Sequence, residues 1–264
     1  MKFTCLFVLI AGCAPAAVYN VRDHGAAGNG TVKDTAAIAK TIAAATQAGG
    51  GVIYFPPGRY LTGAITLASN LTLEVDAGAT ILGSPDPEDY PLRDSGWGDG
   101  RQERSSLIWA EKAENVTLRG HGTIDGQGQY WWRRMGWPDR RRVPQSQRTP
   151  AELAELAKLA GGRPGLINFI RCKYVAIEQV HLKNPGSWTV HPLLCEFVRV
   201  DGITIENPVP SPNTDGINPE ACRNVQIMNS RIDVGDDCVT LKSGITRPDG
   251  GWAGPTKTSP SPTA

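Results

Sequence analysis

Two adjacent carboxylates, Asp236 and Asp237, lie between a glycine and an apolar run in the stretch VGDDCVTLKSG, residues 234–244. Adjacent like charges are costly unless they are solvated, bound to a metal or share a proton. A third carboxylate, Asp215, lies upstream in NTDGINP, residues 213–219. Mutual repulsion raises the pKa of at least one member of such a group, which supplies the protonated acid and the ionised base that glycoside hydrolysis needs.

Two other roles remain open for these carboxylates. Calcium sites use carboxylate and carbonyl oxygens, so the three side chains are also candidates for a metal site. A purely structural cluster is the third alternative. Gly216 and Gly235 allow local bends that aim the acids, and the strand period alone does not decide which face each acid occupies.

A repeat in the second half of the chain predicts how the acids are positioned. Three similar segments begin at Cys172, Cys195 and Cys222, at spacings of 23 and 27 residues. Apolar residues alternate in them with the period of two that is typical of β-strands. Strand-rich units of this length predict a solenoid, and we expect an all-β, right-handed parallel β-helix whose coils stack about 4.8 Å apart. Segments from Asn70 and Asn115 follow the pattern more loosely.

The aligned apolar positions are Val175, Val198 and Val225, then Ile177, Val200 and Ile227, then Leu182, Ile205 and Ile232. In this register the repeated cysteines form an internal ladder of small apolar side chains. Disulfides among Cys172, Cys195, Cys222 and Cys238 are the alternative in an exported protein. None of the four belongs to a C-x-x-C pair, which argues against zinc.

The same register predicts that the carboxylates meet. One apolar column lies five positions before each cysteine. Its members are Ile167, Val190 and Ile217. Placing Val239 in this column brings Asp215 and Asp237 into register one coil apart. Residues one coil apart in a stacked parallel sheet are neighbours, about 5 Å between backbones, so we expect Asp215, Asp236 and Asp237 to form one cluster.

The neighbouring column should face outward beside the cluster. Its members are Asn168, His191 and Asn218, with Thr240 equivalent. His191 is a candidate for substrate binding or proton transfer, and a surface histidine is the alternative. Lys242 follows on the same face. It is positioned to pair either with a substrate carboxylate or with the aspartates themselves.

Two segments fall outside the repeat. Residues 34–50 carry helix formers after Asp34 or Thr35 as N-cap, and this helix should cover the open end of the solenoid. A loop over residues 126–163 contains YWWRRMGWPDRRR and a second short helix from Thr149. Its arginines are either a solvated surface or a wall of a cleft for an anionic substrate, with Trp131 and Trp132 for sugar stacking.

Composition and the N-terminus indicate the compartment. The 264 residues have a net charge of +1, which gives no reason to expect a nucleic-acid partner. One lysine precedes a short apolar run, which predicts a signal peptide over residues 1–16 and no membrane span. IAGC, residues 10–13, also resembles a bacterial lipoprotein site with Cys13 as the lipid-bearing residue. The chain is therefore expected to be secreted or periplasmic, or anchored to an outer membrane, and monomeric.

At the aspartates the chain resembles glycoside hydrolase family 28, the polygalacturonase family. The family motifs N-T-D and G-D-D correspond to Asn213–Asp215 and Gly235–Asp237. The N-terminal helix and the segment GGGVIYFPPGRYLTGAI are similar to the first coils of pectin-active β-helix proteins. The resemblance covers roughly residues 18–255.

The resemblance implies inverting hydrolysis of α-1,4-galacturonosidic bonds in pectin, with pectic polysaccharide as the partner and without a metal or cofactor. It implies that Asp236 is the general acid, that Asp215 and Asp237 hold and activate the water, and that Asn213 contacts the sugar. Inverting geometry calls for acid and base about 6.5–9.5 Å apart. His191 and Lys242 remain candidates for substrate binding.

The chain departs from the family pattern after Asp237, where neither G-H-G nor R-I-K follows. These motifs supply a histidine beside the acids and a cationic clamp for the substrate carboxylate. The expected organisation is one β-helix domain over residues 17–255, incomplete at its C-terminal end, and a tail over residues 256–264 outside the repeat. An incomplete enzyme of reduced activity follows from that expectation.

Two rival functions use the same fold. A calcium-dependent pectate lyase-like enzyme would use the three aspartates as its metal site and release an unsaturated product. A non-catalytic β-helix would bind polysaccharide without creating new reducing ends.

Overall fold

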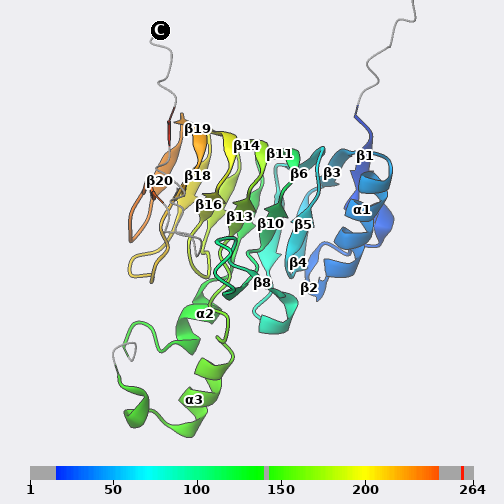
Figure 1. The fold of residues 1–264 in the computed structure, drawn as a ribbon. Coiled ribbons are helices and arrows are strands. Elements are labelled where there is room, and N and C mark those ends of the chain that lie inside the picture. The colour runs from blue at the N-terminus through cyan, green and yellow to red at the C-terminus, as the bar shows by residue number, and fades with distance from the viewer. Residues whose placement is uncertain (1–15, 140–142, 244–256, 259–264) are drawn as a thin grey trace, which may run out of the picture.

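The computed structural model describes residues 16–139, 143–243 and 257–258. Parallel strands stack into three long sheets, and the chain winds once through each sheet per coil (Figure 1). The predicted parallel β-helix is confirmed. One continuous hydrophobic core fills the inside of the stack, and its buried residues run along the sequence from Val21 to Val225.

The strands fall into three parallel sheets and one hairpin. The first sheet contains β1 (Val18–Asn20), β3 (Gly51–Phe55), β6 (Leu71–Val75), β11 (Glu114–Arg119), β14 (Lys173–Glu178), β17 (Glu196–Asp201), β19 (Arg223–Met228) and β21 (Lys257–Thr258). The second contains β2 (Asn29–Lys33), β4 (Gly58–Thr62), β7 (Ala79–Gly83), β12 (Thr123–Asp125), β15 (His181–Lys183), β18 (Thr204–Glu206) and β20 (Arg231–Asp233). The third contains β5 (Ile65–Leu67), β10 (Ile108–Glu111), β13 (Ile167–Ile170) and β16 (Val190–Leu193). The antiparallel pair is β8 (Leu92–Asp94) and β9 (Gln102–Arg104).

The predicted register is confirmed residue by residue. Val175 pairs with Val198, and Val198 pairs with Val225 in the next coil. The second-sheet column runs from Leu182 through Ile205 to its equivalent in β20. Apolar residues one coil apart therefore stack in the core, and polar residues between them face solvent because successive side chains of a strand point to opposite faces.

The repeated cysteines form the predicted internal ladder. Cys172, Cys195 and Cys222 are buried, and within the described part of the chain they form no disulfide. The Cys172 amide donates to Cys195 Sγ, and the Cys195 amide donates to Cys222 Sγ, each over 3.3 Å. Stacking small thiols at a corner satisfies amides that would otherwise lie unpaired, so no disulfide is needed to hold these coils together. The fourth cysteine, Cys238, is exposed and likewise forms no disulfide with a described residue.

A left-handed residue begins most coils of the first sheet. Such residues are Asn70, Asn115, Tyr174, Phe197 and Asn224, with φ between 56° and 62°. Asparagine accepts this conformation readily, and Asn115 Nδ2 donates to Asn70 Oδ1 across one coil at 2.9 Å. Tyr174 and Phe197 are costlier there, but their rings stack with centroids 5.1 Å apart.

Helix α1 (Thr35–Gln47) covers the N-terminal end of the stack (Figure 1). Ile38, Thr41 and Ala45 form its buried face. Asp34 is the N-cap residue, as predicted, but its carboxylate accepts from the amides of Ala27 and Gly28 rather than from the helix. The helix thus shields strand ends that would otherwise be open to pairing.

The predicted insertion projects from the side of the stack (Figure 1). It contains α2 (Gln129–Arg134) and α3 (Pro150–Ala157), and α3 begins with a capping box between Thr149 and Glu152. Three short 3-10 helices are described, η1 (Val21–His24), η2 (Pro87–Asp89) and η3 (Gln145–Gln147).

The chain ends need one correction. Lys257 and Thr258, expected to belong to a tail outside the repeat, pair in parallel with β19 as β21. The rest of that tail, and the signal peptide and Cys13 up to residue 15, lie outside the described residues. Among the described residues we find no helix long and apolar enough to cross a membrane.

Candidate active site

The three aspartates converge, as the register predicted. Ile217 forms a parallel bridge with Val239, and the Gly216 amide donates to Asp237 O at 2.9 Å. One carboxylate oxygen from each of Asp215, Asp236 and Asp237 lies within 4.8 Å of the others. A Cβ on Gly216 would lie 2.4 Å from Cys238 O, so only glycine permits the close approach that brings the two coils together here.

The carboxylates differ in their surroundings. Asp215 is 5% exposed, whereas Asp236 and Asp237 are exposed. Asn218 Nδ2 donates to Asp215 Oδ2 at 3.0 Å, and Thr240 Oγ1 donates to Asp237 Oδ2 at 3.0 Å. The Asp237 amide donates to Asp236 Oδ1 at 3.0 Å. Each acid therefore has at least one oxygen held by a hydrogen bond.

Burial raises the pKa of Asp215 above its ordinary value of 3.8, and the charge of Asp236 adds to this effect. Three interactions act in the opposite direction. The hydrogen bond from Asn218, the hydrogen bond from the backbone amide of Asp215 itself and the charge of Lys242 all favour the ionised form. The site therefore contains one buried acid with a raised pKa, Asp215, beside two exposed acids, Asp236 and Asp237.

The raised pKa predicts a stability effect for Asp215→Asn. The folded protein binds the Asp215 proton more tightly than the unfolded chain does, so Asp215 lowers stability as the pH rises from 3.8 through the raised pKa. Asp215→Asn should raise the thermal unfolding midpoint at pH 7, and the gain should vanish at about pH 3, where both forms are neutral. Asp233→Asn, at a carboxylate that is 68% exposed, is the matched control. A loss of stability at pH 7 would contradict the expected cost of ionised Asp215.

The distance between the acids does not decide between inversion and retention. The 4.8 Å span joins one selected oxygen of each carboxylate, whereas the 6.5–9.5 Å expected of an inverting pair separates the two carboxyl groups. The expected inversion therefore stays a prediction.

Asn213 is exposed and lies beside the cluster with φ 55°. Its Oδ1 accepts from Arg163 Nη2 at 2.8 Å, and Arg163 Nη1 donates to Gly186 O and Pro212 O at 2.7 and 2.8 Å. These acceptors are all neutral. Burial without a carboxylate lowers the pKa of Arg163 to about 10. Through these hydrogen bonds Arg163 connects the end of the insertion to the loop that contains Asn213.

His191 lies in a chain of polar contacts rather than on open surface. Its Nδ1 is 2.8 Å from Asn168 Nδ2, and its Nε2 is 2.9 Å from Glu220 Oε2. The Glu220 side chain is 11% exposed and that of His191 13%. With Asn168 Nδ2 as a donor, the imidazole donates from Nε2 to Glu220. Both ring nitrogens are engaged, so His191 shapes the site rather than presenting a free nitrogen.

Lys242 connects this chain to the aspartates. Its Nζ lies 4.5 Å from the centroid of the Trp188 ring, a cation–π distance, and the same ring meets His191 edge-on at 4.8 Å. The Thr189 amide, next to Trp188, donates to Asp215 O at 2.9 Å. Trp188 therefore stands between the carboxylates and the His191 chain.

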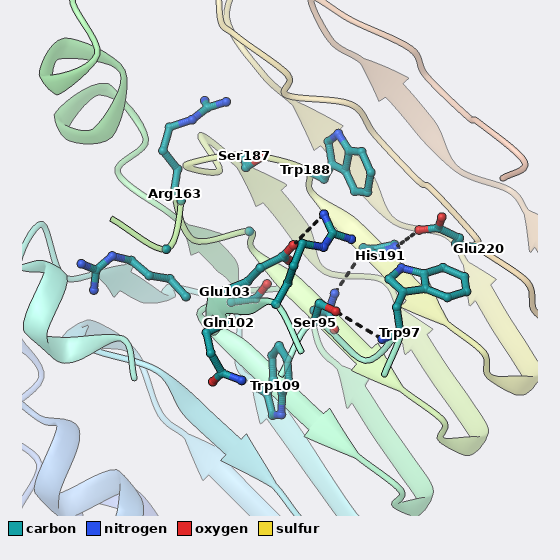
Figure 2. A pocket seen from close by; sticks show the side chains of 17 residues that line it. Ser95, Trp97, Gln102, Glu103, Trp109, Arg163, Ser187, Trp188, His191 and Glu220 are labelled. Carbon is teal, nitrogen blue, oxygen red and sulfur yellow. Dashed lines mark hydrogen bonds and ion pairs between the residues drawn. The ribbon is translucent and has the colours of Figure 1, made fainter. Parts of the chain in front are cut away.

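A large cavity of about 600 Å³ opens beside Trp188 on the outer face of the third sheet. Figure 2 shows Trp188 toward one end of it, Trp109 toward the other, and Trp97 and His191 between them. Arg101 also lines it and contacts Glu103 and Asp99. Aromatic faces beside convergent polar groups are typical of sites that bind a small molecule.

A smaller cavity of about 240 Å³ lies beside Asp236. Asn213, Gly235 and Asp236 line it together with Trp137, whose Nε1 donates to Pro210 O at 3.2 Å. Asp236 lines the small cavity and not the large one. Asp215 and Asp237 line neither cavity, and the lining of each cavity contains tryptophan.

The expected sugar-stacking role of Trp131 and Trp132 is wrong. Trp131 is 0% and Trp132 6% exposed, and both pack in the core under the insertion. Arg134 lies over Trp131 and pairs with Glu155, so this part of the arginine cluster contacts protein rather than a cleft. The arginines at 140–142 lie outside the described residues.

Sequence reasoning missed the residues that line the large cavity. Trp97 comes from a loop outside the repeat, so no register located it. Trp109 carried a usable signal, because it lies in register with Asn168 in the outward column of the third sheet. Glu220 carried a usable signal, because it lies two positions after Asn218 and faces outward with it by strand alternation. Leu193 pairs with Glu220, which places the carboxylate next to His191.

Comparison with known proteins agrees with this architecture. A model of glycosyl hydrolases family 28 matches residues 60–247, and a model described as rhamnogalacturonase A/epimerase, pectate lyase-like, matches residues 18–85. The first match covers most of the chain and includes all three aspartates.

Named relatives are polygalacturonases. A probable polygalacturonase of Vitis vinifera is 35% identical over 232 residues, which cover 84% of this chain and 43% of the relative. An exo-poly-alpha-D-galacturonosidase of Dickeya chrysanthemi is 28% identical and matches 86% of this chain and 42% of its own length. The structure of a hyperthermoactive exopolygalacturonase of Thermotoga maritima superposes with a TM-score of 0.71 at 32% identity, covering 85% of this chain and 54% of that one.

The chain spans about half the length of the relatives it matches. Within the matched span, the three-sheet stack and the paired motifs N-T-D and G-D-D indicate the same family. The chain belongs to glycosyl hydrolases family 28.

Proposed function

We propose that this chain takes part in hydrolysing α-1,4-galacturonosidic bonds of pectic polysaccharide in an exported setting. The convergence of Asp215, Asp236 and Asp237 carries the proposal, because hydrolysis needs an acid and a base in reach of one bond. The polygalacturonase names of its relatives supply the substrate class.

The proposed roles follow from the two environments. Asp236 gives its proton to the glycosidic oxygen, since it lines the small cavity where a leaving sugar would lie. Asp215 and Asp237 hold the water that attacks the anomeric carbon, and Asp215 takes up its proton. Asn218 holds Oδ2 of Asp215 in place for this task. Water adds across the C–O bond, so each cleavage yields one new reducing end.

Asn213, His191 and Lys242 are proposed to contact or frame the substrate. Asn213 borders the small cavity next to Asp236. His191 lines the large cavity, and Lys242 lies over Trp188 at its edge. Lys242 is positioned to attract a uronate carboxylate, and its own positive charge offsets part of the charge of the aspartates.

The proposal is tested by incubating polygalacturonate with the purified chain in the presence of chelator. We expect new reducing ends without an unsaturated, ultraviolet-absorbing product, and proton NMR of the first product should show the β anomer, since the bond cleaved is α. If activity is lost with chelator, and the reaction without chelator gives an unsaturated product, the aspartates would instead be assigned to a calcium site of a lyase. The α anomer as first product would instead indicate a covalent intermediate.

A further inference from the structure

Arg163, at the end of the insertion, connects the linings of the two cavities. It lines the large cavity itself. Two of its hydrogen-bond acceptors, Pro212 and Asn213, line the small cavity together with Asp236. Figure 2 shows the guanidinium of Arg163 turned away from His191. The charged group therefore lies between the lining of the large cavity and the loop that borders the small one.

The surroundings of Arg163 leave its positive charge unbalanced. The guanidinium donates only to neutral oxygens, which are the carbonyls of Gly186 and Pro212 and the side-chain amide of Asn213. Within the described part of the chain it forms no ion pair, and burial lowers its pKa to about 10. Enclosing a charge without an opposite charge destabilises a folded protein. A bound anion would supply the missing charge.

The guanidinium retains hydrogen-bond donors for such an anion. It carries more N–H groups than its three hydrogen bonds to the protein use, and these groups form a planar fork. A planar fork matches a carboxylate, whose two oxygens accept two parallel hydrogen bonds. Arg101, which lines the same large cavity, already pairs with Asp99. Arg163 is therefore the better candidate for binding a carboxylate of the substrate.

The same guanidinium orients Asn213. Because Asn213 Oδ1 accepts from Arg163 Nη2 at 2.8 Å, Nδ2 is the end of the amide that remains for a ligand. Asn213 and the proposed acid Asp236 line the same small cavity. A cation and an amide donor are thus fixed relative to each other at this cavity. Together they can hold one uronate unit by its carboxylate and by a neighbouring oxygen.

We propose that Arg163 binds a carboxylate of the galacturonan through its planar fork and, by fixing the Asn213 amide, positions the same sugar at the aspartates. The proposal rests on the proposed function for the identity of the substrate. It assigns the preference for acidic over methyl-esterified pectin to a residue of the insertion. The repeat supplies the aspartates, and the insertion supplies this charged contact.

Calorimetric titration tests the contact without requiring turnover. In the Asp236→Asn background, trigalacturonate should bind at least about tenfold more tightly than its fully methyl-esterified form, a difference of about 1.4 kcal/mol. Adding Arg163→Gln should remove most of this preference, because the neutral amide no longer favours the charged sugar. The methyl groups meet the same cavities in both proteins, so their steric effect cancels when the two preferences are compared. An unchanged preference in folded Arg163→Gln would overturn the proposal.

Arg163→Lys separates the fork from the charge. Lysine keeps the positive charge but not the planar pair of donors. In the Asp236→Asn background, Arg163→Lys should therefore retain part of the preference for the acid and raise the Kd for trigalacturonate severalfold. This variant also decides the matter if Arg163→Gln does not fold. An unchanged Kd in folded Arg163→Lys would overturn the proposed contact through the fork.

Arg134→Gln is the control for the placement of the insertion. Arg134 donates to Pro85 O at 2.7 Å and pairs with Glu155, and it lines neither cavity. The variant should lower the thermal unfolding midpoint and leave the preference for the acid unchanged. An equal loss of preference in Arg134→Gln would assign the effect to a displaced insertion and overturn the contact with Arg163. If the Asp236→Asn protein shows the Arg163-dependent preference but the unaltered chain releases no reducing ends, the contact stands and the proposed hydrolysis is rejected.

Discussion

Asp236→Asn should lower kcat on oligogalacturonates by about 10²–10⁴-fold relative to the unaltered chain, with KM changed little. The amide keeps the shape of the carboxyl group but has no proton to give to the leaving oxygen. Substrate contacts made by Trp188 or Asn213 remain, so binding should persist. The measurement is initial-rate kinetics of reducing-end release.

A substrate with a better leaving group distinguishes the role of the general acid from that of the general base. A 4-nitrophenyl α-galacturonide leaves without needing a proton, so Asp236→Asn should lose much less of its rate on this substrate. Asp215→Asn should lose rate on both substrates, because activation of water is needed in either case. Asp233→Asn, on an exposed strand end, is the control and should match the parent. Equal losses for Asp236→Asn on both substrates would reject its role as the acid.

Asn218→Leu should move the acidic limb of the pH–rate profile upward by about one to two pH units. The Asn218 side chain is 0% exposed, and its Nδ2 is the hydrogen-bond donor to Asp215 Oδ2. A hydrogen bond to a charged group contributes about 1.5–3 kcal/mol, and one pKa unit corresponds to 1.36 kcal/mol. Without the donor, the pKa of Asp215 rises further and less of the base is ionised at a given pH. KM should change less than kcat, since Asn218 lines neither cavity.

A direct titration makes this prediction independent of turnover. Carbon-13 NMR of the Asp215 carboxyl group should show the same upward movement of its pKa in Asn218→Leu. Asn168→Leu is the matched control, because it lies in the same outward column and contacts His191 rather than Asp215. An unmoved Asp215 titration in folded Asn218→Leu would mean that the hydrogen bond does not hold the base in its ionised form.

The same interaction joins stability to function. Burial of Asp215 raises its pKa and makes its ionised form costly, while Asn218 offsets part of that cost. Asp215→Asn is therefore expected to stabilise the fold at neutral pH and to remove the base. Such opposite effects are common where a site holds a group in an unfavourable environment.

The repeat was readable from the sequence because a parallel β-helix reuses one set of contacts in every coil. Aligning Cys172, Cys195 and Cys222 was enough to set the register of the strands around them. From that register the meeting of Asp215 with Asp237 followed by counting, since the coil repeat allows few other neighbours. The outward column through Asn168 and His191 followed from strand alternation in the same way.

The large cavity could not be predicted from the sequence, because much of its wall does not belong to the repeat. Its walls come from the β8–β9 hairpin and from the end of the insertion, which have no periodic pattern and are placed by contacts between segments far apart in the chain. Trp131 and Trp132 were wrongly assigned to sugar stacking because an aromatic pair in a loop fits a binding wall and a buried anchor equally well. Only the tertiary packing distinguishes them, and it places both under the insertion.

The sequence by itself thus determined the fold class, the strand register and the gathering of the three aspartates, because all of these repeat along one axis and depend on local alternation. The tertiary structure decided what surrounds the aspartates. Burial makes Asp215 differ from its exposed neighbours, and the β8–β9 hairpin and the end of the insertion line the large cavity. Such differences arise where the repeat is interrupted, since each depends on a contact that occurs once in the chain.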